Sequence, residues 1–84
     1  MNEPDSLRYK YYLRDLGNLL KESALEAKKI SEKEAPGSEG FHFESGRLMA
    51  YYEVISLMQQ QAQGFQIALE ELDLHDIEPD RDLV

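Results

Sequence analysis

The sequence predicts an all-α protein: an antiparallel two-helix hairpin with a short third helix near the C-terminus. Two long stretches carry apolar residues at steps of three and four, which is the period of an amphipathic helix. A short segment rich in Pro and Gly separates them. The 84 residues are too few for more than one domain. We therefore expect a helical hairpin over residues 1–74, followed by an acidic tail over residues 75–84.

The first helix is expected over about residues 5–34. Asp5 and Ser6 follow Pro4 and can cap its start, and no proline interrupts the stretch before Pro36. Gly17 lies in the helix interior, where glycine costs about 1 kcal/mol relative to Ala, so it either permits a close approach or is a tolerated weakness. One buried stripe is predicted to contain Tyr9, Tyr12, Leu13, Leu16, Leu19, Leu20, Ala24, Ala27 and Ile30.

The turn is predicted over residues 35–40, with the sequence APGSEG. Pro36 stops the first helix, glycines allow the reversal, and Ser38 is a candidate cap for the next helix. A connection this short makes the two helices antiparallel neighbours.

The second helix is expected over about residues 41–63, with a further short helix over about 66–73. Gly64 is the candidate end of the helix because glycine tolerates the left-handed conformation of a helix C-terminus. The apolar positions alternate in steps of three and four over several heptads, as in bundles. The predicted hairpin seam contains Leu48, Tyr51, Ile55, Met58, Ala62 and Phe65.

A hairpin of this size predicts self-association. A small chain buries little of its surface, and without cysteines it has no disulfides to compensate. The second helix is also apolar on more than one side, which a monomer would leave exposed. We therefore expect a homodimer that forms a four-helix bundle. Alternatively, a different protein covers the exposed apolar side of the second helix. Candidate interface residues are Tyr11, Met49, Tyr52, Val54, Leu57, Gln59 and Gln61.

The net charge of −8 is concentrated near the C-terminus, where one basic residue, Arg81, stands among many acidic ones. Such a surface repels phosphate backbones, so we expect no nucleic-acid binding, and it suits a basic protein partner. The candidate acidic partner surface contains Glu70, Glu71, Asp73, Asp76, Glu78, Asp80 and Asp82. Ile77 and Leu83 are the residues that could hold the tail against the hairpin.

The sequence predicts no catalytic residue, no cofactor and no metal. Glu39 and His42 have the Glu-x-x-His spacing of di-iron bundles, but few other carboxylates fall near the predicted seam. His75 is expected on the surface, and no serine lies in a nucleophile elbow. The polar N-terminus has no apolar signal segment, and no apolar run is long enough for a membrane span. We expect a cytoplasmic protein that does not enter membranes.

These features favour a non-catalytic helical protein that acts through protein–protein contacts as a homodimer. An inhibitor or immunity-type protein that masks a basic partner is one alternative. Metal or ligand binding in the bundle core is a second alternative. A nucleic-acid regulator that uses the basic residues of the first helix is the least favoured, because nearby acidic residues compensate their charge.

Overall fold

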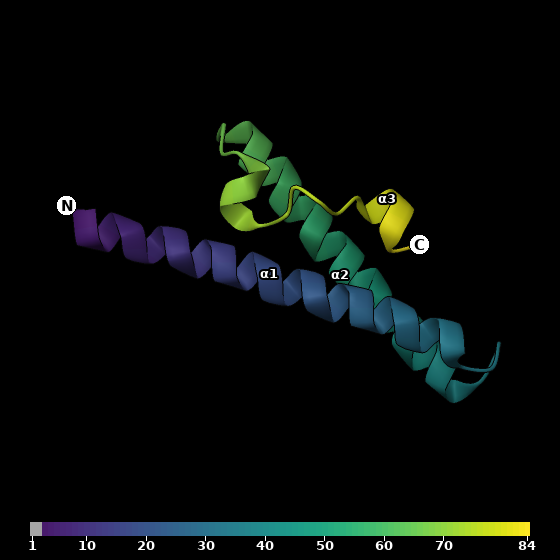
Figure 1. Ribbon diagram of the computed structural model, residues 1–84. Helices are drawn as coiled ribbons and strands as arrows, with labels where there is room; N and C mark the ends of the chain where they lie inside the picture. The colour runs from purple at the N-terminus through teal and green to yellow at the C-terminus, as the bar shows by residue number, and fades with distance from the viewer. Residues whose placement is uncertain (1–2) are drawn as a thin grey trace.

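The computed structural model describes residues 3–84, which contain helices and no strand. Two long helices, α1 (Glu3–Lys33) and α2 (Glu39–Gly64), pack against each other as a hairpin (Figure 1). They are followed by a 3-10 helix, η1 (Leu69–Leu72), and a one-turn helix, α3 (Pro79–Asp82). The predicted all-α hairpin with a short additional helix near the C-terminus is confirmed.

The turn between α1 and α2 has the chemistry that its sequence predicts. Gly37 has a φ of +81°, a conformation that residues with a Cβ rarely adopt. Ser38 caps α2, because its Oγ accepts a hydrogen bond of 3.1 Å from the backbone N–H of Phe41. The predicted cap is therefore confirmed.

The end of α2 is a Schellman motif, in which the chain turns through one left-handed residue. The N–H of Ile67 donates to the carbonyl of Ala62 at 2.7 Å, and the N–H of Gln66 donates to Gln63 at 3.1 Å. The helix ends at Gly64, as predicted, but the left-handed residue is Gln66, with a φ of 57°. A non-glycine residue in this position carries a conformational cost.

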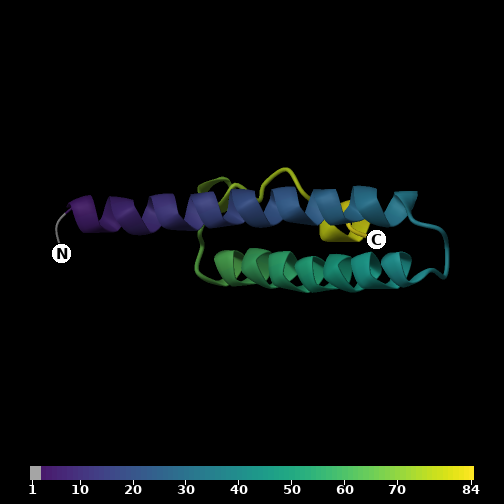
Figure 2. The same ribbon diagram turned by 90° about the horizontal axis from the view of Figure 1, so that it is seen from below.

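Residues 65–84, here called the C-terminal segment, fold back along the hairpin (Figures 1 and 2). The segment lies beside α1 and contacts α2, and Lys28 of α1 donates a hydrogen bond to the carbonyl of Val84. Pro79 is buried at the start of α3. The segment also supplies almost half of the hydrophobic core, which contains Ala24, Ala27, Leu48, Ile55, Ala62, Leu72, Leu74, Ile77 and Leu83.

The C-terminal segment approaches the backbone of α1 closely at Gly17. A Cβ added at Gly17 would lie 1.8 Å from the carbonyl oxygen of Leu72, far inside van der Waals contact. The close-approach explanation of this glycine is therefore correct, although the neighbour is η1 and not a long helix.

The first half of α1 projects past the end of α2 (Figures 1 and 2). Residues 6–15, here called the N-terminal arm, are all exposed. The predicted stripe is therefore wrong in this half: Tyr9, Tyr12 and Leu13 are exposed because α2 diverges from α1 and no other element reaches them. Leu19 is also exposed, and Phe65 is exposed because the chain turns away at the end of α2.

The molecule is elongated, with extents of 52 × 21 × 16 Å. Its radius of gyration is 15.0 Å, whereas a compact domain of this length has about 12 Å. The accessible surface is 6057 Å² for 9.7 kDa, compared with roughly 5,100 Å² for a typical monomer of that mass. The chain therefore exposes roughly 900 Å² more than a compact monomer of its size.

Candidate interaction surfaces

One side of α2 faces away from both α1 and the C-terminal segment. Six exposed residues without charge follow this side at steps of three and four. At 1.5 Å per residue they extend over about 27 Å. We call this surface the outer strip, and it contains Phe43, Gly46, Ala50, Val54, Leu57 and Gln61. Its large members are well exposed: Phe43 by 66%, Leu57 by 56% and Val54 by 41%.

The predicted interface residues do not form one surface. Val54, Leu57 and Gln61 lie on the outer strip. Met49 lies on another side of α2 and lines a shallow hollow with Leu83. Tyr11 belongs to the N-terminal arm, where the guanidinium carbon of Arg14 lies 5.5 Å from its ring centre.

Tyr52 and Gln59, the remaining predicted interface residues, bind the C-terminal segment. The Nε2 of Gln59 donates to the carbonyl of Leu74 at 3.1 Å and to that of Ile77 at 2.9 Å. The hydroxyl of Tyr52 donates to Asp80. This hydrogen bond and the charge of Asp80 raise the pKa of Tyr52 above its usual value. Both side chains therefore have an intrachain role that fixes the position of the segment.

The acidic residues nearest to α1 are neutralised by Lys21, whose side chain is largely buried. Its Nζ donates to the carbonyl of Asp73 and to Oδ1 of Asp76, both at 2.8 Å, and lies 3.2 Å from Oδ2 of Asp73. Asn18 also donates to Asp73, at 2.7 Å. Burial lowers the pKa of Lys21, but the hydrogen bonds to Asp76 and Asp73 outweigh it and raise the pKa above its usual value.

The two carboxylates of this cluster have depressed pKa values. The hydrogen bond from Asn18, followed by that from Lys21, lowers the pKa of Asp73. The hydrogen bond from Lys21 lowers the pKa of Asp76. Both carboxylates are therefore held in their charged form by groups of α1.

Arg81 neutralises the last acidic residues. Its Nε donates to Asp82 at 2.8 Å, and its NH1 lies 3.2 Å from Glu78. These contacts lower the pKa of Asp82 to about 2, with the hydrogen bond from Arg81 as the largest cause. Glu71 lies 3.8 Å from Lys10, and Glu70 is exposed. Most of the candidate acidic partner surface is thus paired within the chain.

The ligand atoms of Asp73, His75 and Asp76 lie within 4.8 Å of one another, a spacing that a metal ion could use. The ammonium group of Lys21, however, already binds both carboxylates of the group. A lysine in this place supplies the positive charge that a metal would supply. Glu39 and His42, the predicted di-iron spacing, are both exposed at the start of α2.

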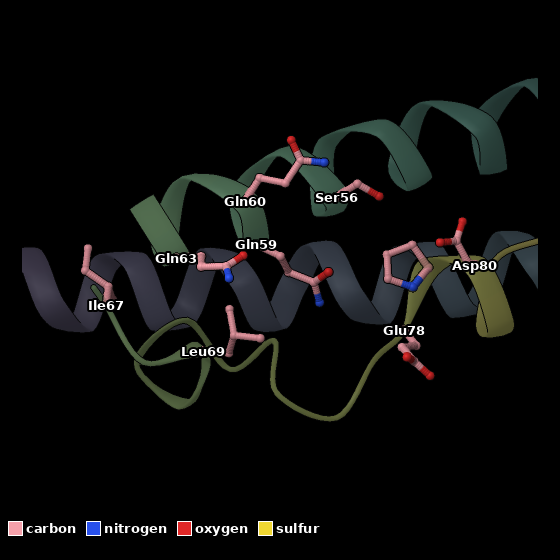
Figure 3. A pocket seen from close by; sticks show the side chains of 9 residues that line it. Ser56, Gln59, Gln60, Gln63, Ile67, Leu69, Glu78 and Asp80 are labelled. Carbon is pink, nitrogen blue, oxygen red and sulfur yellow. The ribbon is translucent and has the colours of Figure 1, made fainter. Parts of the chain in front are cut away.

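A cleft of about 580 Å³ separates α2 from the C-terminal segment (Figure 3). Gln59 and Gln63 extend into it from α2, Asp80 points towards α2, and Leu69 points in from η1. Glu78 and Gln60 point away from the cleft at its edges. The full lining is Ser56, Gln59, Gln60, Gln63, Ile67, Leu69, Glu78, Pro79 and Asp80.

Sequence reasoning missed half of the outer strip and the whole cleft. Phe43, Gly46 and Ala50 continue the predicted interface towards the turn, and the signal was present in their spacing from Val54 and in their lack of charge. The cleft has no comparable signal, because its two walls are separated along the chain and meet only when the C-terminal segment folds back.

Comparison with known proteins gives no assignment: no family model, no curated protein and no solved structure matches this chain. Among the described residues, no helix combines the length and the apolar character that a membrane crossing requires.

Proposed function

We propose that this protein is a non-catalytic interaction module that forms a homodimer through the outer strip of α2. The observation that carries the proposal is the combination of a continuous uncharged helix face with an excess of exposed surface. Contiguous exposed apolar side chains, here those of Phe43, Val54 and Leu57, are typical of association sites.

The excess surface matches the demand of a dimer. A standard protein–protein interface buries about 800 Å² on each partner, which is close to the roughly 900 Å² by which this chain exceeds a compact monomer. Two copies of the hairpin, packed with their α2 helices in the centre, would form the four-helix bundle that the heptad spacing predicts. A two-fold axis would place the same strip on both sides of the contact.

Gly46 supports the assignment of the outer strip as the dimer contact. A Cβ at this position would meet nothing within 4 Å, so the glycine has no packing reason within the chain. In a helix interior it costs about 1 kcal/mol relative to Ala. A neighbouring helix of a second copy provides a reason, because Gly46 and Ala50 allow two helix backbones to approach closely.

The test is the association state of the wild type and of two matched variants. Sedimentation equilibrium of the wild type at micromolar concentrations is expected to show a dimer. Leu57→Lys places a charge in the centre of the strip and is expected to give a monomer, because an unpaired charge is costly to bury. Gln60→Lys adds the same charge three residues further along, outside the strip, and should remain dimeric.

Circular dichroism of each variant establishes that the helices remain formed. A wild type that is monomeric over the whole concentration range contradicts the proposal. Equal effects of Leu57→Lys and Gln60→Lys would place the contact on another surface.

An acidic inhibitor that masks a basic partner is the second candidate function. One observation favours it: the cleft beside the C-terminal segment has Asp80 turned inwards and no basic residue in its lining.

A further inference from the structure

The two halves of the outer strip differ in the size of their side chains. The half nearer the turn has one large residue, Phe43, and two very small ones, Gly46 and Ala50. The half nearer the end of α2 has no small residue and contains Val54, Leu57 and Gln61. Because successive residues turn by about 100° around an α-helix, all six fall within a sector of about 80° and face the same way. A neighbouring helix therefore meets both halves, and its direction decides which side chains oppose each other.

A second copy that runs antiparallel brings the small half of one strip against the large half of the other. The two strips overlap fully when they are centred at the level of Tyr52, which is midway along the strip. Each residue of one half then opposes a residue of the other half, in the pairs Leu57 with Gly46, Val54 with Ala50 and Phe43 with Gln61. Every pair occurs twice, because a two-fold contact is the same from both sides.

This pairing fills the space between the helices evenly. Side chains pack to the density of a protein interior when large and small residues alternate across the contact, so that the two layers interdigitate. Leu57 is well exposed in the single chain and needs an apolar cover. Gly46 offers the room for it, because nothing of its own chain lies within 4 Å of the place where a Cβ would be.

A parallel second copy would oppose each residue with its own counterpart. Gly46 would face Gly46 and leave a gap, whereas Phe43 and Leu57 would each face a large side chain and hold the helices apart. A close crossing of the helices at Gly46 would remove the gap, but Leu57 lies roughly 16 Å further along the helix and would lose its contact. The order of sizes therefore favours the antiparallel direction.

We propose that the outer strip binds the outer strip of a second copy in the antiparallel direction, with Leu57 of each copy over Gly46 of the other. The inference rests on the proposed homodimer and adds the direction and the register of its contact. Residue 46 of one copy then lies at the level of residue 57 of the other. Two residues 46, or two residues 57, lie roughly 15–18 Å apart along the helices.

The chain has no cysteine, so disulfide cross-linking of the full chain maps this contact directly. Gly46→Cys and Leu57→Cys proteins are oxidised separately and as a mixture, and intact mass spectrometry identifies the products. The mixture is expected to give mainly the mixed disulfide, because a disulfide needs two Cα atoms within about 7 Å, and each protein alone should give little. Ser56→Cys replaces Leu57→Cys as the control: it lies one residue earlier but lines the cleft, so it should give little mixed product.

An exchange of two side chains tests the register without cysteines. Ala50→Val places a large residue opposite Val54, and Val54→Ala leaves a gap opposite Ala50. Each change is expected to raise the Kd of the dimer roughly tenfold, because it occurs at two places in a two-fold contact. The double variant restores a pair of one large and one small residue, so its Kd should return to within roughly threefold of the wild type. Sedimentation equilibrium measures all three values.

The outcomes that overturn the register differ from those that overturn the homodimer. Disulfides within each protein alone, in place of the mixed one, would show a parallel dimer on the strip and would leave the proposed function standing. A double variant as weak as its two single changes combined would show that residues 50 and 54 do not face each other. A dimer that cross-links at neither residue 46 nor residue 57 would overturn both proposals, and so would a monomeric wild type.

Discussion

The two ends of the chain contrast in a way that composition does not anticipate. The N-terminal arm carries Leu7, Tyr9, Tyr11, Tyr12 and Leu13, yet all of them are exposed. The C-terminal segment is rich in acidic residues, yet it supplies Leu72, Leu74, Ile77 and Leu83 to the core. A segment is buried when neighbouring elements can pack against it, and the arm extends past the end of α2 (Figure 2) and meets η1 through Lys10, which pairs with Glu71.

The largest expected effect is the loss of stability when a side chain of the C-terminal segment is truncated, compared with truncation in the N-terminal arm. Leu74→Ala removes one of the two largest fully buried side chains and is expected to destabilise the fold by about 2–5 kcal/mol. Tyr12→Ala, on the exposed arm, should change the stability of the monomer by less than about 0.5 kcal/mol. Urea denaturation at low protein concentration measures both values. A large effect of Tyr12→Ala would mean that the arm packs against something in solution.

The next prediction compares two glycines in helix interiors. Gly17→Ala forces a Cβ against the carbonyl of Leu72 and is expected to destabilise by about 1–3 kcal/mol. Gly46→Ala meets no atom of the chain and should stabilise the monomer by about 1 kcal/mol. Thermal unfolding measures both. If Gly17→Ala stabilised the protein as Gly46→Ala does, the close packing of η1 on α1 would be disproved.

If the outer strip forms the dimer contact, Gly46→Ala should also weaken the dimer while it stabilises the monomer. A more stable monomer in unfolding experiments together with a weaker dimer in sedimentation would support Gly46 as a point of close approach between two copies. An unchanged dimer affinity would place the close approach elsewhere.

A smaller effect concerns the charges that bind the C-terminal segment to α1. The pKa values of Asp73 and Asp76 are lowered in the folded state, so their contribution is present above the usual carboxyl pKa near 4 and is lost as the pH falls through the folded values. The pKa of Lys21 is raised, so its contribution is present below its usual pKa and is lost as the pH rises through the folded value. Lys21→Met should therefore reduce both the loss of stability at low pH and the loss of stability at high pH.

Urea denaturation at a series of pH values measures this effect. The loss of stability in Lys21→Met at neutral pH should be smaller than that in Gly17→Ala, because Asp76 is half exposed to solvent. Lys29→Met, at an exposed position of the same helix, serves as the control. If Lys21→Met and the wild type lost the same free energy of unfolding as the pH is lowered, the ion pairs of Lys21 would not hold the segment.

The smallest expected effect lies where the C-terminal segment leaves α2. Gln66→Gly relieves the cost of a left-handed residue with a side chain and should stabilise by about 0.5–1 kcal/mol. Gln63→Gly, in the last turn of α2, is the control and should destabilise the protein, because glycine is unfavourable within a helix. A destabilised Gln66→Gly variant would contradict the Schellman geometry.

Much of the fold was predictable from local physical chemistry. Pro36 and Gly37 mark the turn, Ser38 caps α2, and α2 ends at Gly64. These features depend on residues within a few positions of one another, so they can be read without knowing where distant parts of the chain lie. Leu48, Ile55 and Ala62 could be assigned to the core for a similar reason, because their helical spacing already places them on one face.

The sequence alone thus determined two helices, their caps, their antiparallel order and an uncharged face on α2. Only the tertiary structure decided which apolar residues are buried, because burial depends on elements far apart in the chain. The angle between the helices leaves the arm exposed, and the return of the C-terminal segment turns Gln59 and Tyr52 inwards and creates the cleft. Helical periodicity places a residue on a face, but it does not show what covers that face.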